Sequence, residues 1–164
     1  MAMKKEQRGF ALLIAVIFMS VMLTFGLALG SLGYKQEVLA SGALGSQYAF
    51  YVADAALECA LYADQQQDTF AYTSNMSAPA PSMTCGGTSP VSSSVVSHTA
   101  SAWIVTERFQ LDNGEHCADV MISKPASAVS TLTYLYSQGY DVPCATVAAP
   151  GGARFASRGL SAHY

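Results

Sequence analysis

Apolar residues are unevenly distributed along this chain, and their spacing predicts one long helix followed by several strands. Residues 9–34 contain no ionisable acid or base except the phenol of Tyr34. The 23 apolar-rich residues Phe10–Leu32 would form a helix about 35 Å long, which is enough to cross a bilayer. The run is longer than the apolar core of an ordinary secretory signal. The sequence therefore predicts a membrane-spanning helix over 10–33.

Beyond this span, the helix is expected to continue as an amphipathic segment over 34–63. No proline occurs between Phe10 and Ala78, so the backbone chemistry does not end the helix early. Apolar residues recur at steps of three and four, the spacing of one helix face. The members of this face are Leu44, Tyr48, Tyr51 or Val52, Ala55, Cys59 and Tyr62. We expect this stripe to pack on a β-sheet.

The remaining residues, 64–164, predict a small extracytoplasmic β-domain. Residues 73–101 are rich in Ser, Thr and Pro and predict a loop with one short strand around Ser82–Cys85. Alternating polarity predicts strands over 102–111, 117–124, 131–136 and 158–164, and Asp112–Glu115 would join the first two as a hairpin loop. The expected inward sets are Trp103, Val105, Phe109 and Leu111 (with Glu107 the exception); Ala118, Val120 and Ile122; Leu132, Tyr134 and Tyr136; and Leu160, Ala162 and Tyr164. A three- or four-stranded antiparallel sheet packed on the helix gives an α+β fold.

Charge indicates the orientation of the N-terminus and argues against nucleic acid as the main ligand. The formal net charge is −3, with 51% hydrophobic and 12% charged residues. Lys4, Lys5 and Arg8 against Glu6 give the first nine residues a net charge of +2, and basic residues before an apolar run hold that end in the cytoplasm. The rest of the chain has 5 basic and 10 acidic side chains, a net charge of −5. Such a domain repels phosphate backbones.

The four cysteines, Cys59, Cys85, Cys117 and Cys144, form no CxxC pair, so zinc-ribbon and thioredoxin functions have no support. An even number behind an export segment indicates two disulfides, whereas four buried thiols are the alternative. Four cysteines allow three pairings, and the sequence alone does not choose among them. Moderate loop lengths favour Cys59–Cys85 with Cys117–Cys144.

The junction Arg8-Gly9-Phe10, with its apolar run beginning directly after the glycine, resembles the class III prepilin signal of type IV pilins and type II secretion pseudopilins. The resemblance implies cleavage by a prepilin peptidase between Gly9 and Phe10, N-methylation of Phe10, and retention of the apolar helix for assembly. Residues 46–62 and 157–164 are similar to the helix and last strand of PilX-like minor pilins. The implied partners are other pilins or pseudopilins and a membrane assembly platform, at the cytoplasmic membrane and then in a surface filament.

One position departs from that family. The fifth residue of the mature chain is usually a glutamate, and here it is Ile14. In the family that carboxylate is thought to pair with the N-terminal ammonium of a neighbouring subunit. Its absence resembles the tip pseudopilin of type II secretion and favours a minor or tip role.

Gly26 and Gly30 form a GxxxG motif that is continued by Gly33, and small residues let helices approach closely. The alternative is that these glycines only bend the helix.

Two alternatives remain for the N-terminal segment. Ala28-Leu29-Gly30 fits an ordinary signal peptidase site, which would release a soluble domain. A plain single-pass anchor would instead carry an extracytoplasmic binding module that does not polymerise.

The sequence offers no catalytic constellation, and neither a cofactor nor a small-molecule substrate is expected. His98, His116 and His163 are scattered, and His116 and Cys117 would point to opposite faces of one strand. Asp112, Asn113 and Glu115 could hint at calcium, but their spacing does not match an EF-hand and favours a polar turn.

Overall fold

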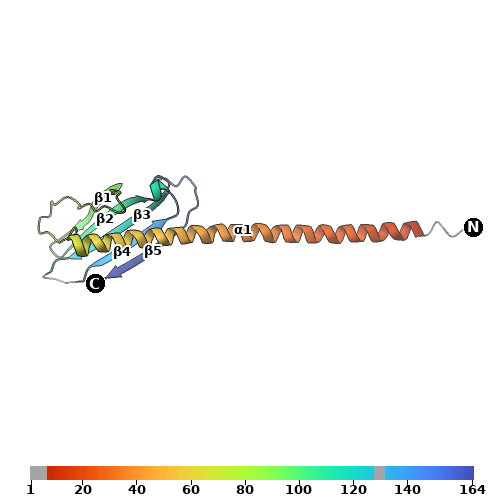
Figure 1. Ribbon diagram of the computed structural model, residues 1–164, viewed down its shortest axis with the longest axis horizontal. Helices are drawn as coiled ribbons and strands as arrows, with labels where there is room; N and C mark the ends of the chain where they lie inside the picture. Colours follow the sequence, from red (N-terminus) through yellow and green to blue (C-terminus); the bar gives the residue numbers. More distant parts are fainter. Residues whose placement is uncertain (1–6, 128–131) are drawn as a thin grey trace, which may run out of the picture. The chain divides into compact units, whose positions relative to one another are not determined.

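One long helix and an antiparallel sheet make up the fold, which is shown in Figure 1. The computed structural model describes residues 7–127 and 132–164. Helix α1 spans Gln7–Gln67. The strands are β1 (Ser92–His98), β2 (Ala102–Leu111), β3 (His116–Pro125), β4 (Tyr134–Tyr140) and β5 (Ser157–His163), with short helices η1 (Asp112–Gly114) and α2 (Cys144–Ala148). The prediction of an α+β fold is confirmed.

The chain forms two compact units, residues 1–42 and 43–164. In the first unit the described residues, 7–42, all belong to α1. The second unit holds the rest of α1, the whole sheet and both short helices. Among the described residues, all strands belong to the second unit, so only there can the helix bury side chains against a sheet.

The sheet of the second unit is a simple meander in the order β1-β2-β3-β4-β5, with every neighbouring pair antiparallel. The β2–β3 hairpin is in register from Ala102 opposite Pro125 to Leu111 opposite His116. Its turn is made by Asp112, Asn113 and Gly114, at φ values of 50°, 54° and 99°. Asn, Asp and Gly tolerate this left-handed region best, and the predicted hairpin loop is confirmed.

The helix packs on the sheet through small side chains, and the predicted stripe is wrong. Leu44, Tyr48, Tyr51 and Tyr62 are exposed, and of the predicted set only Val52 is fully buried. The buried helix face consists of Ala49, Val52, Ala53, Ala56, Leu57, Ala60, Ala63 and Asp64. The true inner face lies on another side of the helix, because alanine lets the helix backbone come close to the sheet.

Strand β4 shows why this close approach excludes large side chains. Gly139 faces α1, and a Cβ atom there would overlap the backbone of Ala49 and Ala53. The inner residues of this region are Thr133, Leu135, Ser137 and Gly139. The expectation that Leu132, Tyr134 and Tyr136 face inward is therefore wrong, and Thr131, the first residue of that predicted strand, lies outside the described residues.

The other strands differ less from the prediction, although the sheet has five strands rather than three or four. The predicted inward residues of β2 and β3 are buried, except that Leu111 is partly exposed, and Leu160 and Ala162 of β5 pack against the core. Strand β1 lies inside the stretch 73–101 that was predicted to be loop. Strand β4 runs to Tyr140, four residues past the predicted end at Tyr136. The expected strand around Ser82–Cys85 is only an isolated bridge from Cys85 to Thr88.

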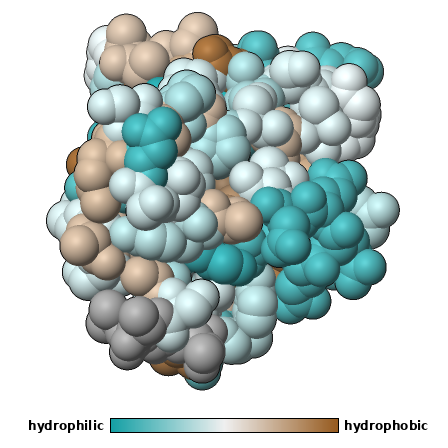
Figure 2. All heavy atoms as spheres, turned by 90° about the vertical axis from the view of Figure 1, so that its left-hand side faces the viewer, coloured by the Kyte–Doolittle hydropathy of each residue, from teal (hydrophilic) through white to brown (hydrophobic). Residues whose placement is uncertain are grey.

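Figure 2 shows the face of the described structure that lies at the left-hand side of Figure 1. Hydrophilic residues gather on one side of this face, whereas apolar residues are scattered among weakly polar ones. Among the described residues of the second unit, α1 carries the largest group of exposed large apolar side chains on one element: Leu44, Tyr48, Phe50, Tyr51 and Tyr62. The others lie on several loops and strands.

Candidate functional site

The first candidate site is the apolar segment of α1 itself. Its large side chains from Phe10 to Leu32 are all exposed, and Ile14 is among them. Within the described residues, the most apolar window of the helix has no share buried inside the protein, and by length and composition this helix can cross a membrane. Lipid or other protein chains are the environments that can cover such a surface.

The few hydroxyl groups of this segment are satisfied within the helix. Ser20 donates to the carbonyl of Ile17 at 2.8 Å, and Thr24 donates to that of Val21 at 2.8 Å. Ser31 donates to the carbonyl oxygen of Ala28 at 2.9 Å. These bonds lower the cost of placing hydroxyls in an apolar medium, because no donor is left unpaired.

The glycines of the span have no packing role within the described residues. A Cβ atom added at Gly26, Gly30 or Gly33 would meet nothing within 4 Å. This openness contrasts with Gly139, where a Cβ would overlap backbone. Any packing role of the three glycines must therefore involve another chain or lipid.

The predicted processing junction lies near the start of α1. The helix begins at Gln7, so Gly9 and Phe10 both have helical backbone, and the Phe10 side chain is exposed. The leader residues Lys4, Lys5 and Glu6 lie outside the described residues. Cleavage and methylation stay predictions.

Both expected disulfides are formed, in the favoured pairing. Cys59 of α1 is bonded to Cys85, and Cys117 of β3 is bonded to Cys144 of α2. The first bridge ties the helix to the turn that precedes β1. The second ties a central strand to the short helix after β4, and Cys117 itself has no exposed surface.

The histidines and the hairpin carboxylates are not gathered into a reactive site. His98 stacks on Trp103 and its Nε2 lies 2.7 Å from the carbonyl oxygen of Thr73. His116 Nδ1 lies 3.0 Å from a carboxylate oxygen of Asp112. Within residues 7–127 and 132–164, no three His, Cys, Asp or Glu side chains are grouped so that they could hold a metal ion.

Two buried carboxylates were not identified as candidate sites from the sequence. Asp64, in the last turns of α1, accepts a bond from Lys124 Nζ at 2.6 Å and another from the Tyr164 hydroxyl. Burial and this bond to Asp64 raise the pKa of Tyr164. The contact joins Tyr164, which directly follows β5, to the end of the helix. A polar residue near the end of a helix is common, so the sequence gives no signal that Asp64 pairs with Lys124 and Tyr164.

Glu107 is the second buried carboxylate, and here a signal existed. It was the one charged residue on the inward parity of β2, and it is almost completely buried. Both its oxygens lie 3.3 Å from the Met83 amide nitrogen, and Oε1 lies 3.3 Å from Ser93 Oγ. Burial outweighs these bonds and raises the pKa of Glu107 to about 7.

Comparison with known protein families, with curated proteins and with solved structures gives no match. The fold and its sites are therefore interpreted from their own chemistry.

Proposed function

We propose that this chain is a non-enzymatic structural subunit, similar to a minor pilin or pseudopilin, that enters or caps a thin extracellular filament. The observation that carries the proposal is helix α1. One element of 61 residues contains both an uncovered apolar segment and a part that packs on a sheet. A helix of this kind suits a protein that is first held in lipid and later packed against other helices.

Assembly would use the apolar face and its glycines. Helices that leave lipid must find equally apolar neighbours, and small residues permit close contact between them. The open surroundings of Gly26, Gly30 and Gly33 are consistent with this use.

The disulfides support an extracytoplasmic position for the second unit. Disulfide bonds persist in oxidising compartments and are rare in the cytosol. Both bridges lie between 59 and 144, on the far side of the apolar segment from the basic leader. The charge of the leader favours a cytoplasmic N-terminus, so a single crossing would place the sheet outside.

Ile14 favours a minor or tip position over the filament shaft. In a helical stack, a subunit without the acid leaves the N-terminal ammonium of the subunit ahead of it unpaired in an apolar core. Such a burial costs several kcal/mol. A copy at a tip has no subunit ahead of it and does not incur this cost.

Mass spectrometry of the mature protein tests the proposal. We expect the chain to begin at Phe10 with a methylated amino group, and Gly9→Val to block this maturation. A chain that begins at Ser31 would contradict the proposal, because ordinary signal peptidase would then have removed the assembly helix.

Position in the filament requires a second test, which also separates a filament subunit from a membrane-anchored binding module that never polymerises. Antibody labelling should find the protein on filaments, sparse and enriched at their ends, and Ile14→Glu should spread it along the shaft. Abundant labelling of the unaltered protein along the whole length would contradict the tip position. Its absence from filaments would favour the anchored module.

A further inference from the structure

The outward face of α1 in the second unit carries a regular, mostly apolar seam that is largely exposed within the described chain. Its positions follow one another at steps of four, three, four, three and four residues, the spacing of a coiled-coil seam. We call this set the outer seam: Leu44, Tyr48, Tyr51, Ala55, Glu58 and Tyr62. Exposed fractions of 56%, 54%, 65% and 59% for Leu44, Tyr48, Tyr51 and Tyr62 show that the seam is not part of the core.

A groove runs beside the outer seam and widens the apolar surface. It has a volume of about 520 Å³ and lies between Tyr48, Tyr51 and Ala55 of α1 on one side and Gly86, Leu111 and Asp112 on the other. A second hollow of about 160 Å³ is lined by Leu44 and Gln47 and shares Tyr48 and Tyr51 with the groove. An apolar groove beside an exposed helix face is typical of surfaces that receive an amphipathic helix.

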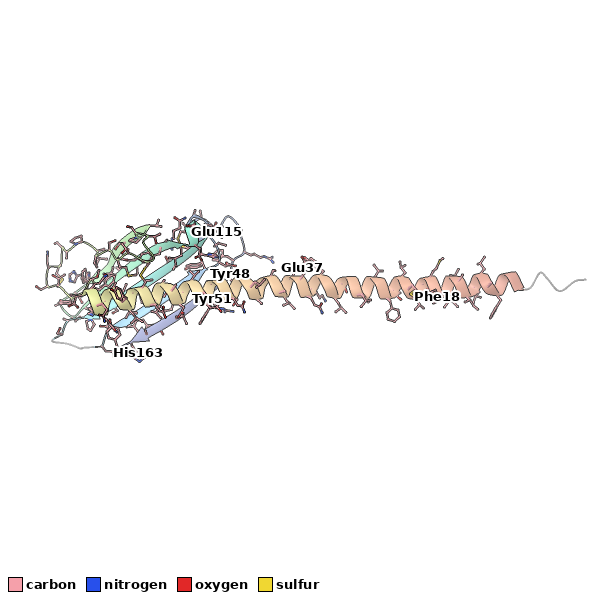
Figure 3. All side chains as sticks on the ribbon, in the orientation of Figure 1. Phe18, Glu37, Tyr48, Tyr51, Glu115 and His163 are labelled. Carbon is pink, nitrogen blue, oxygen red and sulfur yellow. A yellow bond between two sulfur atoms is a disulfide. The ribbon has the colours of Figure 1, made fainter. Side chains whose placement is uncertain are left out.

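The wall of the groove is held in place before any partner arrives. The Tyr48 ring stacks on His116, with centroids 5.4 Å apart and planes 19° from parallel. His116 is in turn held 3.0 Å from Asp112 at the hairpin turn. Figure 3 shows Tyr48 and Tyr51 on neighbouring turns of α1 and Glu115 on the hairpin. Aromatic side chains fixed in this way bind with a small loss of conformational entropy.

Both borders of this surface are acidic. Asp54, which is partly buried, and Glu58, which is exposed, lie four residues apart on α1, a spacing at which like charges repel. Asp112 and Glu115 lie at the hairpin on the other border. Within residues 7–127 and 132–164, no Lys or Arg forms an ion pair with these four acids.

The basic residues of the second unit are mostly engaged elsewhere. Arg108 pairs with Asp119 at 2.6 Å, Lys124 pairs with Asp64 at 2.6 Å, and Arg158 donates to Ser46 at 2.7 Å. A second copy of this chain would place the same acids against each other. A cation on a different chain would relieve their repulsion.

From the spacing of the outer seam, the groove and its acidic borders, we propose that this surface binds an amphipathic α-helix of a different protein. The apolar face of that helix would fill the groove, and its flanking Lys or Arg side chains would pair with Asp54, Glu58 and Asp112. The binding does not require this chain to enter a filament, so it goes beyond the proposed function. The acidic borders also argue against an anionic lipid surface as the occupant.

Site-specific photo-crosslinking of the full chain in its own cells tests this proposal. A benzoylphenylalanine at position 51 should give an adduct with a second protein, and the mapped peptide should be helical with Lys or Arg beside its apolar residues. The matched control is position 134, where Tyr134 is exposed on the opposite face of the sheet; it should not give this adduct. The proposal would be overturned by any of four results: no adduct, an adduct with another copy of this chain, an adduct only with lipid, or a crosslinked peptide without basic residues.

Charge variants test whether the acidic side chains determine which partner binds. Asp54→Asn combined with Glu58→Gln should lower the adduct yield from position 51 at least fivefold. Asp68→Asn removes an acid that lies beyond the end of α1, and asparagine suits its φ of 52°, so the yield should not change. An equal yield in the double variant would overturn the proposal. If the yield is equal but the mature chain begins at Phe10 and is found on filaments, the proposed function remains intact and only the proposed helix binding is overturned.

Discussion

Helix α1 uses its side chains in opposite ways in its two parts. Over 10–42 the large apolar residues are exposed and the glycines have open space around them. Over 43–67 alanines are buried against the sheet, and the large aromatic residues point away from it. The same helical backbone therefore serves one surface that needs an apolar environment outside the protein and another that makes its own core.

The difference shows that hydrophobic size alone does not identify the buried face of a helix. In the second unit, close approach to the sheet brings small side chains inward, because backbone contact leaves no room for aromatic rings. In the first unit the described residues, 7–42, contain no strand, so the large apolar side chains of the helix have no sheet to cover them and stay exposed.

The largest expected effect is the loss of a disulfide, which only the second unit can show because residues 1–42 contain no cysteine. Cys117→Ser with Cys144→Ser should lower the free energy of unfolding by about 3 kcal/mol, because the bridge closes a loop with a separation of 27 residues. Urea titration of the full chain in detergent, followed by the fluorescence of buried Trp103, measures this.

The control uses the intact protein before and after reduction. Helicity from 10–42 should persist in the micelle after reduction, whereas the Trp103 transition should move to lower urea. Four alkylatable thiols in the native, unreduced protein would contradict both bridges.

How much of this structure could be predicted from the sequence depends on how local each signal is. The helix, strand β2 and its hairpin turn were predictable, because periodicity and the Asp-Asn-Gly turn act over a few neighbouring residues. The disulfide pairing was favoured by loop length, although the sequence allowed three arrangements. These features do not depend on how the helix meets the sheet.

The inward faces of α1 and β4 were predicted wrongly because they are decided by the contact between the helix and the sheet. The alanines of α1 and Gly139 of β4 are weakly hydrophobic, so they give little signal until the helix and the strand are placed in contact. Strand β1 was missed because it is an edge strand rich in serine, with few buried residues to mark its alternation. Asp64 could not be linked to Lys124 and Tyr164, which lie 60 and 100 residues further along.

The contrast between glycines gives the next largest effect. Gly139→Ala should lower the free energy of unfolding by about 2–3 kcal/mol, because the added methyl forces the helix and β4 apart. Gly30→Ala is the matched control and should not move the Trp103 transition, since its Cβ would meet nothing within 4 Å. Equal effects in the same urea titration would contradict the distinction between the two parts of α1.

Glu107 gives the second unit a pH dependence. Glu107 ionises near pH 4.5 in the unfolded chain and, because burial raises its pKa, near pH 7 in the folded protein. Between these values the folded state keeps a proton that the unfolded state has lost, so stability falls as pH rises through this window. Below pH 4.5 the full contribution is present.

Substitution of Glu107 by glutamine tests this directly. Glu107→Gln should raise the free energy of unfolding at pH 8 by about 2 kcal/mol and change it little at pH 4. Urea midpoints measured across this range should be flatter in the variant. A variant destabilised equally at both pH values would show that the carboxylate is needed for its bonds to Met83 and Ser93 rather than penalised by burial.

The smallest expected effect concerns the end of α1. Unlike residues 9–34, which carry no acid, this end buries the charge of Asp64 between Lys124 and the Tyr164 hydroxyl. Tyr164→Phe removes one of these two partners and keeps the ring, so it should lower the free energy of unfolding by about 1 kcal/mol. Hydrogen bonds to charged groups contribute about 1.5–3 kcal/mol, and the lower value is expected because Tyr164 is 39% exposed.

Tyr134→Phe is the matched control, since Tyr134 is also 39% exposed and, within the described part of the chain, its hydroxyl is not bonded to a buried carboxylate. Its effect on the free energy of unfolding should stay below about 0.5 kcal/mol. If both variants lose the same stability, the charge of Asp64 is held by Lys124 alone, and Tyr164 does not secure the end of the helix.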